Sequence, residues 1–203
     1  MRGGVRSRPP NVPGAANSPE ADIAELVAQA KLGDTAAFTQ LYRRHVARVY
    51  DFAAWRLPDR HVAEEVTQDV FFRAFRGIAG CRDGAAFSGW LLGIARYVIA
   101  DHYRASPPAS GTLGGSFERE DPEPLPEEQV LQAERNDELR AARENCLSPS
   151  ERDLFDLLLA DLTDREIAVA LNRRYGAVRT AHWRLLAKLR ACFAHLGGRH
   201  VAS

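Results

Sequence analysis

The sequence predicts an all-α protein with two small helical domains joined by a flexible linker. Apolar residues recur at helical spacing through most of the chain, whereas no segment shows the strict alternation of a half-buried strand. Two capping boxes, in which a hydroxyl residue is followed three positions later by Glu, mark helix starts at Ser148 and Thr163. A chain of 203 residues is long enough for one large or two small hydrophobic cores.

Residues 18 to 105 hold four predicted amphipathic helices, which form the first domain. Caps, glycines and prolines delimit them, because these residues favour helix starts and stops. The boundary signals in chain order are Ser18-Pro19 and Gly33, then Asp34 and Pro58, then Asp59 and Gly77, and for the fourth helix the loop GIAGCRDG before it and Pro107-Pro108 after it. The inward stripes are Ile23, Leu26, Val27 and Ala30, then Phe38, Leu41, Tyr42, Val49 and Phe52, then Val62, Val66, Val70 and Ala74, then Phe87, Trp90, Leu91, Ile94, Ala95 and Val98.

The other segments are assigned by composition. Residues 1 to 17 are rich in Pro, Gly and Arg without periodicity, and we expect a disordered basic tail there, with a second tail over residues 197 to 203. Residues 106 to 126 mix Ser, Gly, Pro and acids, which is typical of a linker. The second domain is expected over residues 127 to 196, beginning with a weak helix from Glu127 to Asn145.

The stretch LTDREIAVALNRRYGAVRT predicts a helix-turn-helix. Its first helix runs from Asp164 to Leu171, and Ala168 supplies the small residue where the second helix crosses closely. Asn172 suits the left-handed position of the turn, since Asn tolerates that conformation better than most residues. The second helix buries Val178, Ala181, Leu185 and Leu189, and its outward face consists of Gly176, Arg179, Thr180, Trp183 and Arg184. Such a face suits the major groove of DNA; the alternative is an α-hairpin with a solvated basic face.

Charge is segregated along the chain although the formal net charge is zero. Residues 118 to 138 hold nine acidic residues against two arginines, whereas residues 165 to 199 hold eight basic residues against one acidic residue. Lys31 and Lys188 are the chain's two lysines, so nearly every cation is a guanidinium, which suits bidentate contacts to phosphate and guanine. A basic C-terminal module is therefore predicted behind an acidic segment.

Four segments together resemble a known family. AKLGDTAAFTQLYRRHVARVYDFA, AEEVTQDVFFRAF and FSGWLLGIARYVIADHYR resemble, in order, region 2 of the extracytoplasmic-function sigma factors, the small sigma70-type initiation subunits of bacterial RNA polymerase. LSPSERDLFDLLLADLTDREIAVALNRRYGAVRTAHWRLLAKLR resembles their region 4. The resemblance implies an alternative sigma factor that binds core RNA polymerase, recognises and melts promoters, and uses one domain for the minus-10 element and the other for the minus-35 element.

The resemblance also implies roles for residues of the first domain. Glu65, Gln68 and Asp69 match an acidic-x-x-Gln-acidic pattern that docks on the polymerase beta-prime clamp; alternatively they form a solvated face. The residues expected to hold melted minus-10 DNA are Trp90 and, on outer or flanking faces of the fourth helix, Arg96, Tyr97, Tyr103 and Arg104. Trp90 fits the core equally well, and Tyr97 stands where the family often has Asn. The loop from Gly77 to Ala86 is where the family captures a flipped minus-10 base.

In the second domain the family's minus-35 positions fall on the helix-turn-helix. The matched residues are Arg173, Arg174, Arg179, Thr180, Trp183 and Arg184. Arg174 replaces the usual Ser or Thr cap and Arg173 a commonly apolar turn residue, and both place guanidiniums where a helix N-terminus favours phosphate. The family further implies contact with the polymerase beta flap and, in many members, an anti-sigma factor. The acidic linker either threads the RNA exit path or serves as a solvated tether.

Other classes of protein are less well supported. Nucleophile-elbow, P-loop and H-E-x-x-H motifs do not occur, so no enzyme and no cofactor are predicted. Cys81, Cys146 and Cys192 are an odd, scattered set that fits a reducing cytoplasm better than a disulfide framework. A metal site at Cys192, His195 and His200 is weighed against polar residues at a helix end, and no metal is expected. With no long apolar run, we expect a soluble cytoplasmic protein without membrane insertion. A free-standing helix-turn-helix regulator is the remaining alternative.

Overall fold

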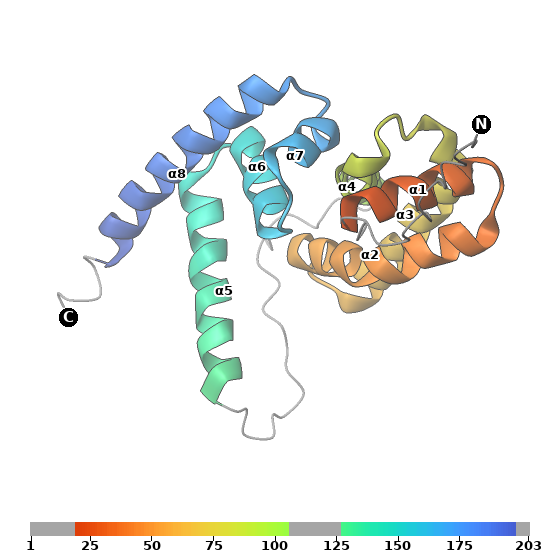
Figure 1. Ribbon diagram of the computed structural model, residues 1–203. Helices are drawn as coiled ribbons and strands as arrows, with labels where there is room; N and C mark the ends of the chain where they lie inside the picture. Colours follow the sequence, from red (N-terminus) through yellow and green to blue (C-terminus); the bar gives the residue numbers. More distant parts are fainter. Residues whose placement is uncertain (1–18, 106–126, 198–203) are drawn as a thin grey trace, which may run out of the picture.

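The computed structural model describes residues 19–105 and 127–197 and is all-α over these ranges (Figure 1). The helices are α1 (Pro19–Lys31), α2 (Thr35–Arg56), α3 (Arg60–Gly77), α4 (Phe87–Ala105), α5 (Glu127–Cys146), α6 (Pro149–Leu159), α7 (Asp164–Ala170) and α8 (Tyr175–Gly197), with the short 3-10 helices η1 (Ile78–Gly80) and η2 (Gly84–Ala86) before α4. The predicted basic tail, the acidic linker and all of the predicted C-terminal tail except Gly197 lie outside the described residues.

The start signals read from the sequence cap the helices as expected. The Asp34 carboxylate accepts hydrogen bonds from the backbone N–H groups of Ala36 and Ala37 at 2.8 and 3.1 Å, and Asp59 accepts one from His61 at 2.8 Å. Gly33 ends α1 with a φ of +93°, which a residue with a side chain rarely adopts. The four predicted helices of the first domain are thereby confirmed, each within a few residues of its expected boundaries.

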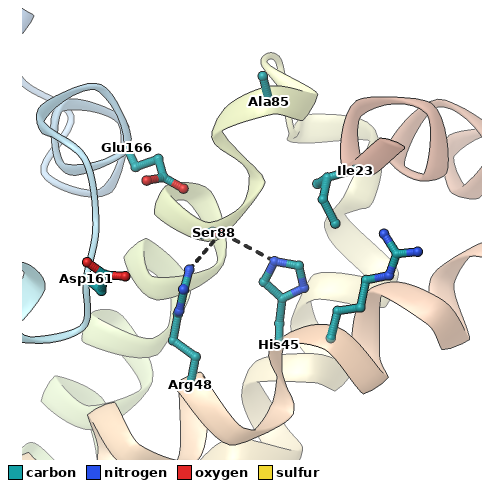
Figure 2. A pocket seen from close by; sticks show the side chains of 8 residues that line it. Ile23, His45, Arg48, Ala85, Ser88, Asp161 and Glu166 are labelled. Atoms are coloured by element: carbon teal, nitrogen blue, oxygen red, sulfur yellow. Dashed lines mark hydrogen bonds between the residues drawn. The ribbon is translucent and has the colours of Figure 1, made fainter. Parts of the chain in front are cut away.

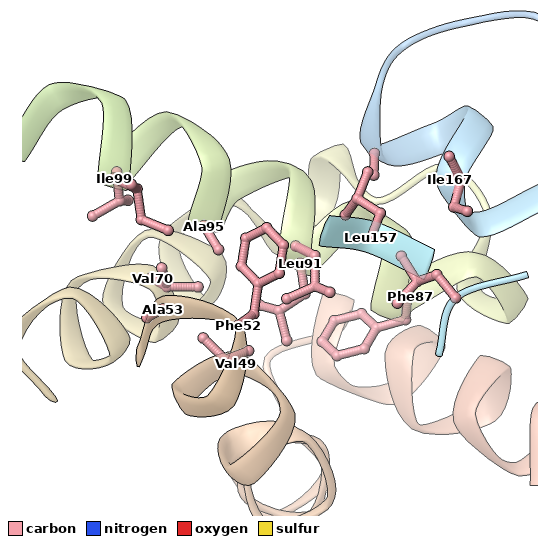
Figure 3. Packing of buried hydrophobic residues seen from close by; sticks show 14 of the residues in the cluster. Val49, Phe52, Ala53, Val70, Phe87, Leu91, Ala95, Ile99, Leu157 and Ile167 are labelled. Atoms are coloured by element: carbon pink, nitrogen blue, oxygen red, sulfur yellow. The ribbon is translucent and has the colours of Figure 1, made fainter. Parts of the chain in front are cut away.

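The first four helices pack around one hydrophobic core. Figure 3 shows Val49 and Phe52 of α2 meeting Val70 of α3 and Leu91 of α4. These side chains are at most 3% exposed, so each is removed almost completely from water. Tyr42, which was predicted to face inward, is 42% exposed and lies edge-on against Phe71.

The last four helices contain the predicted helix-turn-helix. Both capping boxes form: the Glu151 carboxylate accepts from the Ser148 N–H at 2.8 Å, and that of Glu166 from the Thr163 N–H at 2.9 Å. Asn172 has a φ of +50°, which confirms the left-handed turn. Asp161, between α6 and α7, also has a positive φ, of +57°, which the sequence reading did not anticipate.

The two groups of helices also pack against each other. Phe87 of α4, Leu157 of α6 and Ile167 of α7 are fully buried and belong to the same hydrophobic cluster as the core of the first group (Figure 3). Gly89 of α4 lies against the α7 backbone so closely that a Cβ there would be 2.1 Å from the Glu166 carbonyl oxygen. The sequence predicted two domains on a tether, and nothing in it indicated this interface.

The cysteines differ from expectation. Cys146 at the end of α5 and Cys192 in α8 form a disulfide with a Cα–Cα distance of 6.4 Å. The prediction that the cysteines form no disulfide is therefore wrong for this pair, because residues 46 apart in sequence are adjacent where the two helices meet. Cys81 is free and buried, and burial raises the pKa of its thiol to about 11.

Candidate nucleic-acid interface

The turn between α7 and α8 fixes where the second helix begins. The N–H of Arg173 donates to the Ala168 carbonyl at 2.9 Å, which satisfies a carbonyl that the end of α7 would leave free. Arg174 then occupies the N-cap position, and its carbonyl accepts from the N–H of Val178 at 3.1 Å. Both arginine side chains are exposed beside the N-terminus of α8, where backbone N–H groups and the helix dipole favour an anion.

The outward face of α8 is polar and aromatic. Arg179, Thr180, Trp183 and Arg184 are all exposed, and Trp183 retains 72% of its accessible surface. The opposite face holds the buried side chains of α8, including Val178, Leu185 and Leu189. All six residues predicted to face the minus-35 element therefore lie on exposed surface at or beside one face of α8.

Tyr175 belongs to this face although the sequence reading missed it. Its ring is 51% exposed, and the guanidinium carbon of Arg179 lies 6.0 Å from the ring centroid. An aromatic residue four positions before an outward-facing arginine was the available signal, since residues at this spacing are neighbours on a helix.

Three links hold α8 against the rest of the C-terminal helices. The His182 ring nitrogen Nδ1 lies 2.7 Å from the Asp164 carboxylate at the start of α7. The Lys188 ammonium lies 2.7 Å from the Glu151 carboxylate at the start of α6. Lys188 and the Ser148 N–H together lower the pKa of Glu151 to about 2. With the disulfide as the third link, these contacts set the direction in which the outward face points.

The predicted minus-10 residues divide into two groups on α4. Tyr97 is 65% exposed, and Arg104 is exposed beside Asp101, to which it donates a hydrogen bond. Trp90 is partly buried, with its ring 5.7 Å from that of Phe87. Tyr97 and Arg104 are thus available to a ligand, whereas Trp90 packs largely against protein.

Arg96 and Tyr103 point toward other helices. The Tyr103 hydroxyl donates to the Arg56 carbonyl at 2.5 Å, and burial raises the pKa of this phenol. Position 103 continues the buried series of Ala95 and Ile99 at four-residue intervals, which explains its inward direction. The Arg96 guanidinium donates to the Asp153 carboxylate at 2.5 Å and to the Ala170 carbonyl at 3.1 Å. The expectation that both side chains lie on outer or flanking faces of α4 therefore differs from what the structure shows.

The predicted polymerase-binding residues lie on the outside of α3. Glu65 and Gln68 are exposed, and Asp69 is half-buried in a pair with Arg73 at 2.8 Å. Arg73 also donates to Asp101 of α4 at 3.0 Å, and this hydrogen bond lowers the pKa of Asp101.

Two aromatic residues that the sequence reading passed over extend this surface of α3. Phe72 and Phe75 are 59% and 49% exposed, and Phe75 lies edge-on against Phe38 with ring centroids 5.0 Å apart. Their position outside the apolar stripe of α3 was the signal, because exposed phenylalanines on a polar face are unusual.

A cavity of about 360 Å³ opens between α2, α4 and α7 (Figure 2). It is lined by Ile23, Arg44, His45, Arg48, Ala85, Ser88, Asp161 and Glu166. His45 is one of its polar lining residues: Nδ1 lies 2.9 Å from the Leu41 carbonyl oxygen and Nε2 lies 3.3 Å from the Ser88 hydroxyl, and burial lowers the His45 pKa. The lining mixes two cationic arginines with two carboxylates, so it does not select a charge.

Neither a metal centre nor a membrane span is found in the described residues. Within those ranges no group of three or more His, Cys, Asp and Glu side chains is placed to hold a metal ion. The alternative metal site at Cys192, His195 and His200 would need a free Cys192 thiolate, but Cys192 is in the disulfide. His200 lies outside the described residues. None of the described helices is long and apolar enough to cross a membrane.

Comparison with known proteins gives consistent matches. Residues 41–106 match the family model Sigma-70 region 2. The ECF RNA polymerase sigma factor BldN of Streptomyces coelicolor is 32% identical over 178 residues, which cover 86% of this chain and 67% of BldN. The ECF RNA polymerase sigma factor SigX of Bacillus subtilis is 26% identical over 158 residues, covering 75% of this chain and 81% of SigX.

A solved structure shares the fold. CnrH in complex with the cytosolic domain of CnrY matches with a TM-score of 0.60 and 24% identity, covering 86% of this chain and 98% of that chain. At this identity the match supports the arrangement of helices rather than any particular ligand or partner.

Proposed function

The chain belongs to the extracytoplasmic-function sigma factors, and from this premise we propose which of its residues contact polymerase and promoter. It is an alternative sigma factor, which binds core RNA polymerase and promoter DNA and directs transcription initiation. We propose that it does so in the cytoplasm and without an enzymatic step of its own, through a region 2 domain over residues 18 to 105 and a region 4 domain over residues 127 to 196.

The exposed face of α8 carries the proposal for the minus-35 element. Arg179, Trp183 and Arg184 stand on the outward side of a helix whose direction is fixed by contacts to α6 and α7. Arginine can bind guanine bidentately in the major groove, and an exposed indole can contact a thymine methyl group. Thr180 and the two turn arginines, Arg173 and Arg174, complete the set, the arginines as phosphate contacts at the helix N-terminus.

For the minus-10 element, we propose that Tyr97 and Arg104 contact melted DNA first. An exposed ring can stack on an unpaired base and a guanidinium can neutralise a backbone phosphate, which is the chemistry that single-stranded DNA requires. Arg96, Trp90 and Tyr103 lie partly buried on the same helix. The Arg96 guanidinium already pairs with the Asp153 carboxylate, so it can bind DNA only if this pair separates.

For core polymerase, we propose that Glu65, Gln68 and Asp69 bind the beta-prime clamp and that region 4 contacts the beta flap. The acidic side chains and the amide lie along one exposed side of α3, where they can receive hydrogen bonds from a basic partner. An anti-sigma factor as a further partner stays a prediction from the family.

Run-off transcription tests the proposal. Purified chain added to core enzyme on genomic fragments should give discrete transcripts that neither component gives alone. Arg184→Ala should reduce them by an order of magnitude or more, because one bidentate base contact provides about 1–3 kcal/mol of discrimination. Arg135→Ala, which removes the same charge from the exposed side of α5, serves as the matched control.

The alternative function is that of a regulator that binds duplex DNA alone, and such a regulator would bind its site without core RNA polymerase. Sequence-specific binding without core enzyme, together with failure to compete with another sigma subunit for core, would require the proposed function to be abandoned.

A further inference from the structure

The Cys146–Cys192 disulfide closes a loop around the helix-turn-helix. Residues 146 to 192 contain α6, α7 and most of α8, and all six residues proposed for the minus-35 element lie between the two cysteines. The first domain lies entirely outside this loop. Formation or loss of the bond therefore acts on the DNA-reading helices and leaves the covalent structure of the first domain unchanged.

Cys192 packs as an apolar residue whether or not the bond is present. It is 9% exposed and continues the buried stripe of α8, three residues after Leu189 and seven after Leu185. A reduced cysteine behaves as a small hydrophobic side chain in such a position. Reduction therefore removes the covalent link without placing a strongly polar group in the core, and the reduced chain can keep the same helices.

Few other contacts join α5 to the last turns of α8. Ala142 is the one completely buried side chain among those described in α5. Over residues 186 to 194, α8 buries Leu189 and Cys192, and Lys188 adds a half-exposed ion pair to α6. Exposed ion pairs contribute little to stability. The disulfide is thus a main restraint where α5 meets α8 (Figure 1).

Cys146 is the sulfur that a reagent can reach. It is partly exposed at the end of α5, whereas Cys192 is nearly buried. The Arg152 guanidinium lies against the chain on both sides of Cys146, because it donates to the Glu144 carbonyl at 2.8 Å and to the Leu147 carbonyl at 3.1 Å. A nearby positive charge favours the thiolate, which is the reactive form of cysteine. Cys146 is therefore placed as the attacking thiol and Cys192 as the resolving thiol.

The third cysteine is not placed to react. Cys81 is buried in the first domain, and burial raises the pKa of its thiol to about 11. It is therefore protonated at neutral pH and shielded from reagents. The chain thus combines one accessible cysteine pair in the DNA-reading helices with one inert thiol outside them.

The C-terminal helices form a unit small enough for one cross-link to matter. They span residues 127 to 197, and a core built from about 70 residues has little stability to spare. A disulfide that encloses a long loop stabilises such a unit mainly by restricting its unfolded chain. The apparent affinity for DNA falls with the fraction of molecules in which the reading helices are correctly ordered.

We propose that Cys146 and Cys192 form a reversible oxidation site, whose disulfide orders the helix-turn-helix and raises the affinity of the holoenzyme for the minus-35 element. In a reducing cytoplasm the pair is in its dithiol form, because disulfides of cytoplasmic proteins are usually transient or redox-sensing. The oxidant is hydrogen peroxide and the reductant is a small thiol. The effect on DNA rests on the proposed function, whereas the chemistry of the cysteine pair does not.

Closure of the bond consumes one peroxide. The Cys146 thiolate attacks one peroxide oxygen, the O–O bond breaks and hydroxide leaves, which gives a sulfenic acid. The Cys192 thiolate attacks the sulfur of that sulfenic acid, so that the S–S bond forms and a second hydroxide leaves. The two thiol protons convert both hydroxides to water, and two electrons pass from the sulfurs to the peroxide.

Reopening of the bond consumes two small thiols. The thiolate of the first attacks the Cys146 sulfur, and Cys192 leaves as a thiolate that takes up a proton. The second small thiol then attacks the mixed disulfide, which restores the Cys146 thiol and releases the oxidised form of the small thiol.

Counting of thiols in the native full chain tests the reversibility. A maleimide coupled to polyethylene glycol adds one gel shift for each accessible thiol. Excess reduced glutathione should give two shifts, and hydrogen peroxide added after removal of the glutathione should abolish both. Cys81→Ala is the matched control, since it removes the buried thiol, keeps the pair and should respond in the same way. A bond that excess glutathione leaves closed in the native chain is a permanent structural disulfide, and the proposal fails.

Hydrogen exchange of the free chain, measured by mass spectrometry, tests the ordering. Reduction should speed exchange of the α6 and α8 amides about tenfold, because local opening becomes more frequent, while α3 outside the loop should not change. Cys146→Ser should show the faster rates with or without peroxide. Cys192→Ala keeps an apolar side chain in the buried stripe and is measured as well, in case Cys146→Ser loses helical circular dichroism. Equal rates for the oxidised and reduced chains in α6 and α8 would refute the ordering.

DNA binding by the holoenzyme tests the functional effect. The chain is oxidised or reduced and freed of reagent before core enzyme is added. The probe is a fluorescein-labelled promoter duplex recovered by run-off transcription, and the oxidised holoenzyme should bind it about tenfold more tightly. A shorter duplex that begins downstream of the minus-35 element should be bound equally by both forms, and Cys192→Ala should not respond to peroxide on either probe. Equal affinity for the longer duplex, or tighter binding by the reduced form, would overturn the proposal.

Failure of this proposal is distinguishable from failure of the proposed function. Run-off transcripts from a chain whose oxidation changes neither exchange nor DNA affinity would refute the oxidation site alone. A cysteine pair that opens, closes and orders α8 as expected, in a chain that gives no transcript with core enzyme, would refute the proposed function and with it the effect on the minus-35 element.

Discussion

Asp156 offers the sharpest test of the packing between the domains. This side chain is completely buried in α6, and Arg143 of α5 donates to both of its oxygens, at 2.7 and 2.9 Å. Trp55 of α2 donates its indole N–H to the same carboxylate at 3.0 Å. One buried anion thus joins α5 and α6 to a helix of the first domain.

The Asp156→Asn substitution keeps the volume and one acceptor but removes the charge. Removal of one partner of a buried ion pair costs about 3–5 kcal/mol, and we expect the lower end because Asn can still accept from Trp55. A loss of about 3 kcal/mol corresponds to a decrease in Tm of about 6–12 °C for a chain of this size. With an m value of about 3 kcal/mol/M, the urea midpoint falls by about 1 M.

The assay is urea denaturation followed by circular dichroism, with Asp51→Asn as the control. Asp51 is exposed on α2, so its substitution should change stability by less than about 0.5 kcal/mol. A double-mutant cycle of Asp156→Ala, which removes both acceptor oxygens, with Trp55→Phe should give a coupling energy of about 1.5 kcal/mol, which isolates the contact between the domains. If Asp156→Asn and Asp51→Asn agree within about 1 kcal/mol, the buried pair does not form in solution and the reasoning fails.

Three further predictions concern the cysteines, pH and the turn. Ellman titration should detect essentially no thiol in the native, unreduced chain, because the Cys81 thiol is buried and its pKa is raised to about 11. After denaturation without reduction it should detect one thiol. Three thiols would exclude the Cys146–Cys192 disulfide. Reduction should then lower the free energy of unfolding by about 4 kcal/mol on the loop-entropy estimate for a 46-residue separation, and Cys146→Ser should remove this sensitivity. Because the folded-state pKa of Glu151 is depressed from 4.5 to about 2, its contribution to stability is present above pH 4.5 and is lost as the pH falls from 4.5 toward 2, so Glu151→Gln should flatten the stability curve in that window. Arg174→Ala should weaken binding of a minus-35 duplex to the holoenzyme and reduce the slope of log K against log salt by about 1; an unchanged slope would remove Arg174 from the phosphate contacts.

The sequence by itself determined the helices and the outward face of α8. Asp34, Asp59, Ser148 and Thr163 cap helices because a side-chain oxygen or a capping box acts within three residues of chain. The left-handed turn at Asn172 was predicted for the same reason, since it depends on local backbone geometry. Periodicity then placed the arginines of α8 on the outside, because the opposite side had to be buried.

Only the tertiary structure decided what happens between the domains. Gly89 meets Glu166, Arg96 meets Asp153, and Cys146 meets Cys192 across separations of 77, 57 and 46 residues. Such contacts depend on the shape of two assembled surfaces, which no local spacing rule encodes. Periodicity placed Arg96 at the edge of the buried stripe of α4, which is compatible with binding either DNA or another helix. In the structure Arg96 contacts another helix. The close packing of α7 on Gly89 and Gly93 of α4 brings the Asp153 carboxylate of α6 within hydrogen-bonding distance of Arg96.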